Sequence, residues 1–295
     1  MSKNRTAHVL LRGGGDLATG VALRLYRAGI HLVIAELAQP LAVRRTVSFA
    51  EAVYEGAYTV EGVMSRLVKW EQLQASLDAD AEAIPVLIDP EADILRHHPF
   101  SVVVDARLLK TPPPPLPVDV PLHIGLGPGF RAGENCHAVI ETRRSHTLGR
   151  VYWTGTTQPD SGEPEGDRRR VLRAPADGVL ISTVGIGQHV EEEQEIAVIQ
   201  HVILRERSDR RISTHDEETL RSAQSDTKVV SPFAGILRGL IHDGLHVTKG
   251  LKIGDVDARG DASTCSLVSD KALAIGGGVL EALLSKEEIR EKIFG

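Results

Sequence analysis

The sequence predicts an α/β domain, then a β-rich domain and a short C-terminal helical tail. Three observations support this: apolar runs alternating with helical segments in the first third, a proline run, and an internal repeat in the second half. Strands that are apolar on both faces and alternate with helices indicate a parallel sheet. Short repeated strands joined by glycine turns indicate all-β structure.

The first third contains four candidate buried strands. In the helical segment 17–29, Leu17, Val21, Leu25 and Ala28 recur at helical spacing. The strands are HVLLR (8–12), HLVIAEL (31–37), IPVLIDP (84–90) and SVVVDA (101–106). We therefore expect residues 1–125 to form a Rossmann-like domain with a parallel sheet.

A glycine run follows the first strand and opens the first helix, where a dinucleotide-binding motif would lie. Its backbone N–H groups would meet a pyrophosphate, and Glu36, about 20 residues further on, would bind a ribose. The candidate cofactor-binding residues of the run are Gly13, Gly14, Gly15, Asp16 and Leu17. Asp16 would repel an anion unless it points away, and the alternative is a turn that binds nothing.

Arg44 and Arg45 lie just after the second strand. Guanidinium groups bind phosphates well, so this pair would suit the 2′-phosphate of NADP, whereas Glu36 disfavours it. The alternative is a pair of ordinary surface arginines. NAD and NADP therefore both stay open as candidate cofactors.

Composition narrows the class of protein. The chain has 295 residues and a net charge of −6, which argues against a duplex nucleic-acid binder. Cys136 and Cys265 are its only cysteines and fit a reducing compartment. We expect a cytoplasmic protein, because neither a signal peptide nor a membrane span is recognisable.

A proline-rich hinge at 111–121 is expected to end the first domain, because consecutive prolines exclude helix and central strand. A β-rich domain over 126–262 should follow. Within it, residues 174–196 are repeated at 231–253, so that Gly178 aligns with Gly235. This register, kept over turn and core positions, indicates a duplicated β-module.

The repeated pattern resembles the half-motifs of biotinyl and lipoyl domains, which have the barrel-sandwich hybrid fold. The connection between the copies, 201–229, lacks the lysine-bearing tip of those domains, and Lys228 lacks its flanking residues. The resemblance therefore implies a scaffold or ligand surface rather than a swinging-arm carrier.

Two residues are candidates for catalysis. Cys136, beside His137, could be an activated thiol, although a buried structural cysteine is the alternative. Lys110 could serve as an acid or base if the chain were an oxidoreductase. No metal site is predicted, because Cys136 has no Cys-x-x-Cys partner.

The tail, 263–295, contains a second triple glycine, Gly276 to Gly278, which we expect to open onto a helix. It would allow close packing against a sheet or form a second anion site. Ser285 with Glu288 fits a capping box before a terminal helix over 286–294.

Seven blocks in order, among them RGGGDLATGVALRLYRAG, IGLGPGFRAGENCHAVIETRR and VSDKALAIGGGVLEALL, resemble the YqeB-type accessory family. The resemblance implies maturation of selenium-dependent molybdenum hydroxylases. A nucleotide-type cofactor, NAD(P) or molybdopterin cytosine dinucleotide, would be delivered to a client hydroxylase, and Cys136 would touch the metal centre or chalcogen. Arg144-Ser145-His146 departs from the family's Arg-Gly-His-like turn. An NAD(P)-dependent oxidoreductase and a non-enzymatic scaffold remain alternatives, and an oligomer is compatible with the sequence.

Overall fold

The computed structural model describes residues 8–78, 82–162, 166–201 and 226–295. The chain divides into two compact units. Unit 1 comprises Met1–Glu163 together with Ser266–Gly295, and unit 2 comprises Pro164–Cys265. Unit 2 is therefore inserted into the sequence of unit 1, and each unit is described by itself.

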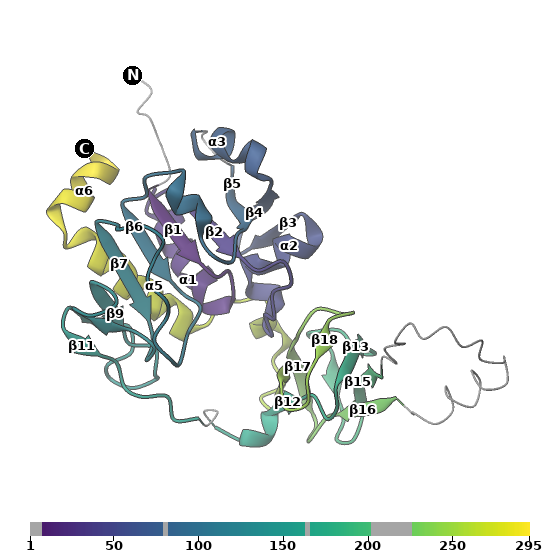
Figure 1. Ribbon diagram of the computed structural model, residues 1–295. Helices are drawn as coiled ribbons and strands as arrows, with labels where there is room; N and C mark the ends of the chain where they lie inside the picture. The colour runs from purple at the N-terminus through teal and green to yellow at the C-terminus, as the bar shows by residue number, and fades with distance from the viewer. Residues whose placement is uncertain (1–7, 79–81, 163–165, 202–225) are drawn as a thin grey trace, which may run out of the picture. The chain divides into compact units, whose positions relative to one another are not determined.

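In the described part of unit 1, nine strands form one sheet in the order β10-β9-β7-β6-β1-β2-β5-β4-β3 (Figure 1). All neighbours pair in parallel except β10 with β9 and β3 with β4 at the two ends. The strands are β1 (Val9–Arg12), β2 (Leu32–Glu36), β3 (Ala57–Val60), β4 (Val63–Val68), β5 (Ala83–Ile88), β6 (Val102–Asp105), β7 (Leu122–Leu126), β9 (Ala138–Ile140) and β10 (Val151–Tyr152). A short pair, β8 (Arg131–Ala132) and β11 (Gly155–Thr156), lies apart.

Helices and loop segments cover the two faces of this sheet. One apolar cluster joins alternate strand residues such as Leu11 and Val104 to α1, α5 and α6. A second cluster joins the other face, including Leu10 and Val103, to α3 and the 3₁₀ helix η3. The helices are α1 (Asp16–Arg27), α2 (Ala52–Glu55), α3 (Trp70–Asp78), α5 (Asp270–Leu284) and α6 (Glu287–Phe294), with 3₁₀ turns η1 (Arg45–Val47), η2 (Phe49–Glu51) and η3 (Asp93–Arg96). Both faces are thus buried, as expected for parallel strands.

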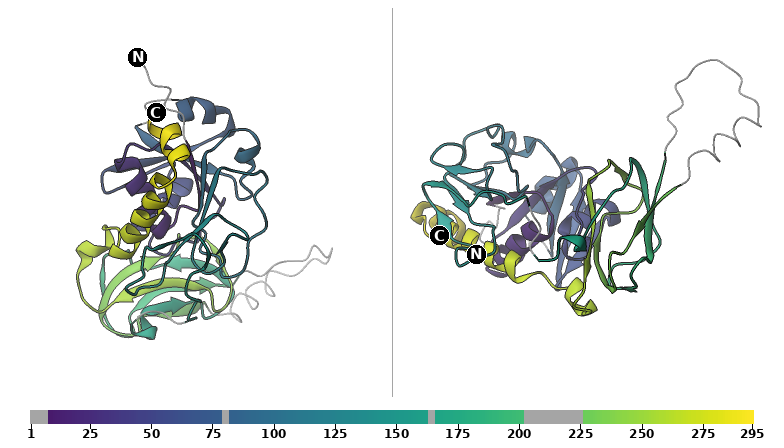
Figure 2. Two further views of the ribbon diagram at one scale, coloured as in Figure 1. Left: turned by 90° about the vertical axis from the view of Figure 1, so that its left-hand side faces the viewer. Right: turned by 90° about the horizontal axis from the view of Figure 1, so that it is seen from below.

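Helices α1 and α5 pack side by side on one face of the sheet (Figures 1 and 2). Their backbones meet where a Cβ on Gly276 would lie 2.6 Å from the Gly20 carbonyl oxygen. A Cβ on Gly20 would likewise lie 2.6 Å from Ala272. A Cβ on Gly278 would lie 2.0 Å from the carbonyl oxygen of Gly149. The triple glycine therefore lies inside α5 and permits close packing, whereas Ser269 caps the helix with its side chain.

Unit 2 consists of two four-stranded antiparallel sheets in its described residues, ordered β12-β19-β17-β14 and β16-β15-β13-β18. The strands are β12 (Val171–Arg173), β13 (Gly178–Ser182), β14 (His189–Val190), β15 (Glu195–Gln200), β16 (Thr227–Val230), β17 (Gly235–Leu240), β18 (His246–Val247) and β19 (Lys252–Asp257). The 3₁₀ turns η4 (Arg168–Arg170) and η5 (Ala262–Cys265) flank them.

The sequence repeat of unit 2 is also a repeat of structure. Strands β13, β14 and β15 begin at residues 178, 189 and 195, and β17, β18 and β19 begin at 235, 246 and 252, 57 positions later in each case. The copies exchange their shortest strands, because β14 pairs with β17 and β18 pairs with β13. Neither copy completes a sheet alone, so the duplication is needed for the fold.

The domain boundaries differ from those expected. The boundary near residue 125 is wrong, because β7, β9 and β10 extend the sheet of unit 1. The proline-rich segment is no hinge between units, since Leu116, Val118 and Val120 pack against the core of unit 1. The tail is likewise not separate, because α5 and α6 belong to that same core. No helix within the described ranges has both the length and the apolar character needed to cross a membrane.

Two predicted helix caps are absent, although short helices do form nearby. The hydroxyl of Ser48 donates to the Arg44 carbonyl, and that of Ser285 donates to the Ala282 carbonyl. Neither side chain caps a helix. Sequence spacing therefore predicted where these short helices lie, but not which groups begin them.

The glycine contacts predict opposite effects for neighbouring substitutions. We expect Gly276→Ala to lower the free energy of unfolding by about 1–3 kcal/mol, because the added methyl group overlaps α1. Gly277→Ala is the matched control: it has open space and should be neutral or stabilising by up to about 1 kcal/mol. Urea unfolding of the full chain measures both, and equal effects would contradict the close contact.

Candidate functional site

The carboxyl edge of the unit 1 sheet is the natural place for a ligand. Strand β2 lies beside β1 on one side, and β6, which comes later in the chain, lies beside β1 on the other side. In open α/β sheets, ligands bind outside the carboxyl ends of the strands at such a reversal. Arg12 ends β1 and Asp105 ends β6, and the two residues are in register.

Two arginines share the Asp105 carboxylate at this point. Arg107 donates from Nε and Nη2 over 2.9 and 2.6 Å, and Arg12 donates from Nη1 over 3.4 Å. Asp105 and Arg12 are buried, whereas the side chain of Arg107 is 25% exposed. Burial lowers the pKa of Arg12, and Asp105 opposes that shift. Asp105 thus holds two guanidinium groups, and the carboxylates of Glu91 and Asp89 also act on Arg12.

The turn after β5 completes the surroundings of Arg12. Arg12 Nη2 donates to the Pro90 carbonyl over 3.1 Å. The carboxylate of Asp89 accepts the backbone N–H groups of Asp93 and Ile94, each over 2.9 Å. Asp89 is therefore engaged in shaping the turn, and Asp105 is the carboxylate that pairs directly with both arginines.

His123 lies on β7, opposite Val103 of β6 and on the same sheet face as Asp105. Its ring is buried, and Nε2 has no hydrogen-bond partner among the described residues. Burial lowers the pKa of His123 to about 4, against the opposing effect of Asp105. The imidazole is thus neutral near pH 7, and its unpartnered Nε2 is buried from solvent.

Cys136 does not have the properties expected of a nucleophile. It is a buried free thiol in an apolar cluster with Phe130, Ala132 and Val139. Burial raises its pKa to about 11, against backbone hydrogen bonds from Gly125 and others that favour the thiolate. A thiol with that pKa is almost entirely protonated near neutral pH. The structure therefore favours the buried structural cysteine over the activated thiol.

The glycine run after β1 is closed by the protein's own side chains. The Glu36 carboxylate accepts the backbone N–H of Gly14 over 2.6 Å and that of Leu37 over 2.7 Å. The Gly14 carbonyl accepts the N–H of Ala50 over 2.9 Å. Burial raises the pKa of Glu36, and these two N–H groups oppose that shift. Glu36 was expected to bind a ribose and the Gly14 N–H a phosphate. In the structure the two bind each other.

The remaining residues of the glycine run form a turn and the start of a helix. Gly13 has φ +94° and packs near the Ala106 backbone. Gly15 precedes α1 without a side-chain cap, Asp16 opens the helix, and Leu17 is buried in the apolar core. The structure therefore agrees with the alternative interpretation of this run as a tight strand-to-helix turn.

Three further candidate residues are engaged elsewhere. Arg44 donates to the Leu267 carbonyl over 3.2 Å, and Arg45 pairs with Glu51 over 3.0 Å. Lys110 pairs with Asp160 over 2.6 Å and is 71% exposed. The structure therefore ties each of the three to another group of the protein.

Sequence reasoning did not assign Arg12, Asp105 or His123 to a site. A signal was present: Arg12 and Asp105 are charged residues that end otherwise apolar strands. Carboxyl ends of parallel strands share one edge, so such residues are expected to meet there. His123 gave no comparable signal, because it lies inside β7 and meets Phe130, a residue beyond the strand, only in the folded chain.

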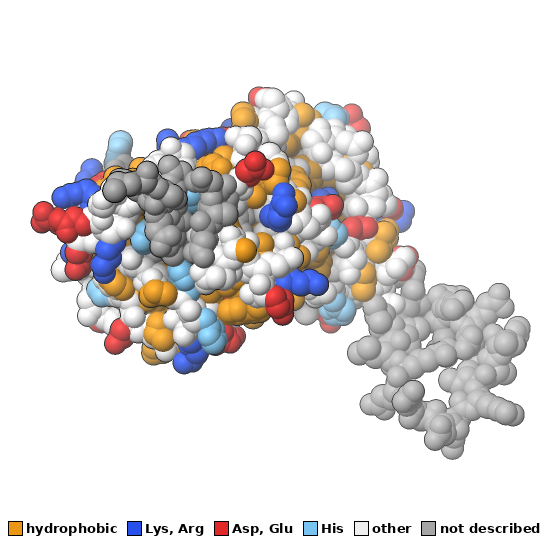
Figure 3. Space-filling view, turned by 90° about the horizontal axis from the view of Figure 1, so that it is seen from above, with side chains coloured by type: hydrophobic (Ala, Val, Ile, Leu, Met, Phe, Trp, Pro, Cys, Tyr) orange, Lys and Arg blue, Asp and Glu red, His pale blue; other side chains and the backbone are white. Residues whose placement is uncertain are grey.

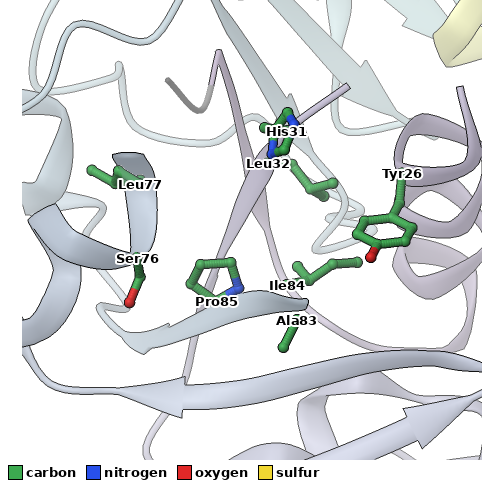
Figure 4. A pocket seen from close by; sticks show the side chains of 8 residues that line it. All are labelled: Tyr26, His31, Leu32, Ser76, Leu77, Ala83, Ile84 and Pro85. Atoms are coloured by element: carbon green, nitrogen blue, oxygen red, sulfur yellow. The ribbon is translucent and has the colours of Figure 1, made fainter. Parts of the chain in front are cut away.

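A separate hollow lies at the opposite, amino edge of the sheet, where β2 and β5 begin (Figure 4). Its lining is mostly apolar and comes from α1, β2, α3, β5 and the residue before β2: Tyr26, His31, Leu32, Ser76, Leu77, Ala83, Ile84 and Pro85. No lysine, arginine or carboxylate is among these residues.

On the face shown in Figure 3, acidic and basic side chains are interspersed rather than gathered by sign.

Comparison with known proteins gives one sequence relative and several remote structural likenesses. The "Uncharacterized protein YqeB" of Escherichia coli K12 is 42% identical over 280 residues, which cover 94% of this chain. The chain spans only 47% of that protein's length. No family model matches the chain.

Among solved structures, an aspartoacylase family protein from Mesorhizobium loti is 10% identical, with a TM-score of 0.27 over 85% of this chain and 84% of that one. A succinylglutamate desuccinylase from a Silicibacter species is 13% identical, with a TM-score of 0.25 over 86% of this chain and 85% of that one. Likenesses this remote carry no argument about the function of this chain.

The comparisons and the structure correct the assignment made from the sequence. The chain matches the YqeB relative over only 47% of that protein's length. The assignment of a Rossmann-like domain over residues 1–125 followed by a separate barrel-sandwich hybrid-like domain is corrected by the architecture of the chain. The described α/β unit is a nine-stranded mixed sheet completed by C-terminal helices, and its glycine run is closed. NAD(P) binding and molybdenum hydroxylase maturation find no support in these relatives.

The burial of Cys136 predicts slow thiol chemistry. At pH 8 well under about 1% of a thiol with so high a pKa is ionised. We therefore expect iodoacetamide to label the native protein far more slowly than the chain unfolded in guanidinium, in which both cysteines react. Mass spectrometry locates the labelled residue. Rapid native labelling at Cys136 would show that the thiol is activated after all.

The pKa of His123 predicts a pH-dependent stability. The unfolded chain binds a proton near pH 6.5, whereas folded His123 binds one near pH 4. Stability therefore rises with pH between about 4 and 6.5, by about 3 kcal/mol, and this contribution is constant above that window. Unfolding curves at several pH values, compared with those of His123→Leu, isolate the slope. An equal slope in the variant would refute the assignment.

Proposed function

We propose that this chain is an accessory protein that binds a small anionic ligand at the carboxyl edge of unit 1 and presents it to a client enzyme. The observation that carries the proposal is the pair of arginines, Arg12 and Arg107, held on the single carboxylate of Asp105. They stand where the strand order reverses, which is where open α/β sheets bind ligands.

The two arginines differ in exposure and in their contacts, and this difference supports anion binding. Arg12 is buried and tied to the Pro90 carbonyl, so it supplies charge and holds Asp105. Arg107 is partly exposed and carries guanidinium N–H groups suited to a phosphate or carboxylate. A bound anion would accept from the Arg107 N–H groups that Asp105 does not occupy.

The alternatives have less support. An NAD(P)-dependent oxidoreductase would need an acid or base at the nicotinamide, and Lys110 is instead an exposed partner of Asp160. Delivery to a client enzyme rests on the sequence-based expectation. A cytoplasmic location also remains a proposal, and the two free cysteines support it.

Substitution of Arg107 tests the proposal. We expect inorganic phosphate or a nucleotide to bind the full chain in calorimetric titrations, and Arg107→Gln to weaken that binding at least about tenfold through loss of a charge-assisted contact. Arg96→Gln is the control, because Arg96 pairs with exposed Asp93 on η3, outside the cluster. The proposal fails if no anion binds, or if both variants bind like the wild-type chain.

A further inference from the structure

We propose that unit 2 carries a docking surface for a second chain of the same sequence, formed by the outward face of its sheet β16-β15-β13-β18. The two chains pack these faces against each other around a two-fold axis. The inference goes beyond the proposed function and is independent of it, because the anion site lies in unit 1 and this surface lies in unit 2.

The strands of this sheet run side by side in Figure 1, and the centre of their outward face is apolar. Leu180 and Ile199 are fully buried, so the residues next to them in each strand point outward. Among those neighbours, Ile181 pairs directly with Val198. Four β-branched residues, which we call the apolar face, are at least partly exposed: Val179, Ile181, Val198 and Val230. An antiparallel sheet with one face in water normally carries polar residues there.

The internal repeat shows that the fold does not require apolar residues at these positions. Arg238 and Asp255 stand 57 positions after Ile181 and Val198, in the other sheet of unit 2. Arg238 donates to the Asp255 carboxylate over 3.2 Å, and Arg170 of η4 pairs with the same carboxylate. The equivalent pair is thus ionic in one sheet and apolar in the other. Because an apolar patch that the fold does not need marks an interaction site, we assign that role to the apolar face.

Lys228 indicates that the partner docks on the face of the sheet rather than on its edge. Among the described strands, β16 pairs only with β15, so it is an edge strand. Lys228 lies inside β16, and a lysine on an edge strand disfavours the addition of another strand. Two sheets can instead pack their apolar faces about 10 Å apart, as in β-sandwiches.

The charges beside the apolar face favour a second chain of the same sequence over another partner. Lys228 pairs with Glu195 over 3.1 Å, so this surface carries one charge of each sign. The other polar residues at outward positions of these strands are Gln200 and His246. A strongly acidic or basic partner finds no complementary field on such a surface. A two-fold interface needs a self-complementary surface, and here Lys228 of each chain can face Glu195 of the other.

The test measures the mass of the full chain in solution and its dependence on concentration. We expect sedimentation equilibrium to show a reversible dimer. The double variant Ile181→Arg with Val198→Asp should raise the dimer dissociation constant at least about tenfold, because the interface would then have to strip water from an ion pair. This variant copies the pair that Arg238 and Asp255 form in the other sheet, so we expect it to fold.

A second variant and a control accompany it. Val230→Lys should also weaken the dimer, and its side chain is 39% exposed, so the fold depends little on it. Leu267→Arg is the matched control, because Leu267 is an apolar residue of unit 1 that is 52% exposed. We expect it to leave the dimer unchanged. Circular dichroism and thermal unfolding check that each variant is folded.

Two outcomes overturn the inference. One is a wild-type chain that stays monomeric at every concentration. The other is a dimer that both interface variants form as tightly as the wild-type chain, because the contact then lies elsewhere. If the double variant does not fold, Val230→Lys decides the question by itself. The anion site is tested separately by the calorimetric titrations, so it can stand or fail without this surface.

Discussion

The close contact between α1 and α5 is the constraint on which the architecture of unit 1 depends. Glycines at positions 20 and 276 let the two helix backbones approach to a distance that no larger residue permits. This contact fixes a helix from the last thirty residues on the same sheet face as the first helix of the chain. Unit 2 is therefore an insertion, and unit 1 can be completed only after unit 2 has been synthesised.

Two buried carboxylates at the carboxyl edge of the sheet, Glu36 and Asp105, have different hydrogen-bond partners. At the end of β2, Glu36 turns back onto the amide of Gly14 and neutralises the anion-binding potential of the glycine run. At the end of β6, Asp105 instead accepts hydrogen bonds from two arginines. A buried carboxylate paired with backbone amides closes one loop, whereas on the other side of β1 a buried carboxylate holds the two guanidinium groups of the proposed anion site.

The duplication in unit 2 allows two copies of a short β-segment to form a common apolar core. Each copy supplies three strands too short and too few to bury an apolar face alone, and the exchange of β14 and β18 between sheets joins the copies into one core. Buried residues such as Val190 and Val247 occupy equivalent places in the two copies. Strands that are 57 positions apart therefore lie in opposite sheets: β13 and β17, β14 and β18, and β15 and β19.

The sequence by itself determined the elements whose signal is local: the buried strands, the first helix, and the repeat with its glycine turns. Local patterns also predicted helices near Ser48 and Ser285, but not their caps, because these hydroxyls bond to nearby carbonyls instead. Only the tertiary structure decided the domain boundary and the candidate site. Whether Gly14 met a ligand or Glu36, and whether Arg12 met Asp105, depended on residues 22 and 93 positions away. Spacing along the chain does not encode such contacts, since they arise when parallel strands bring their carboxyl ends to one edge.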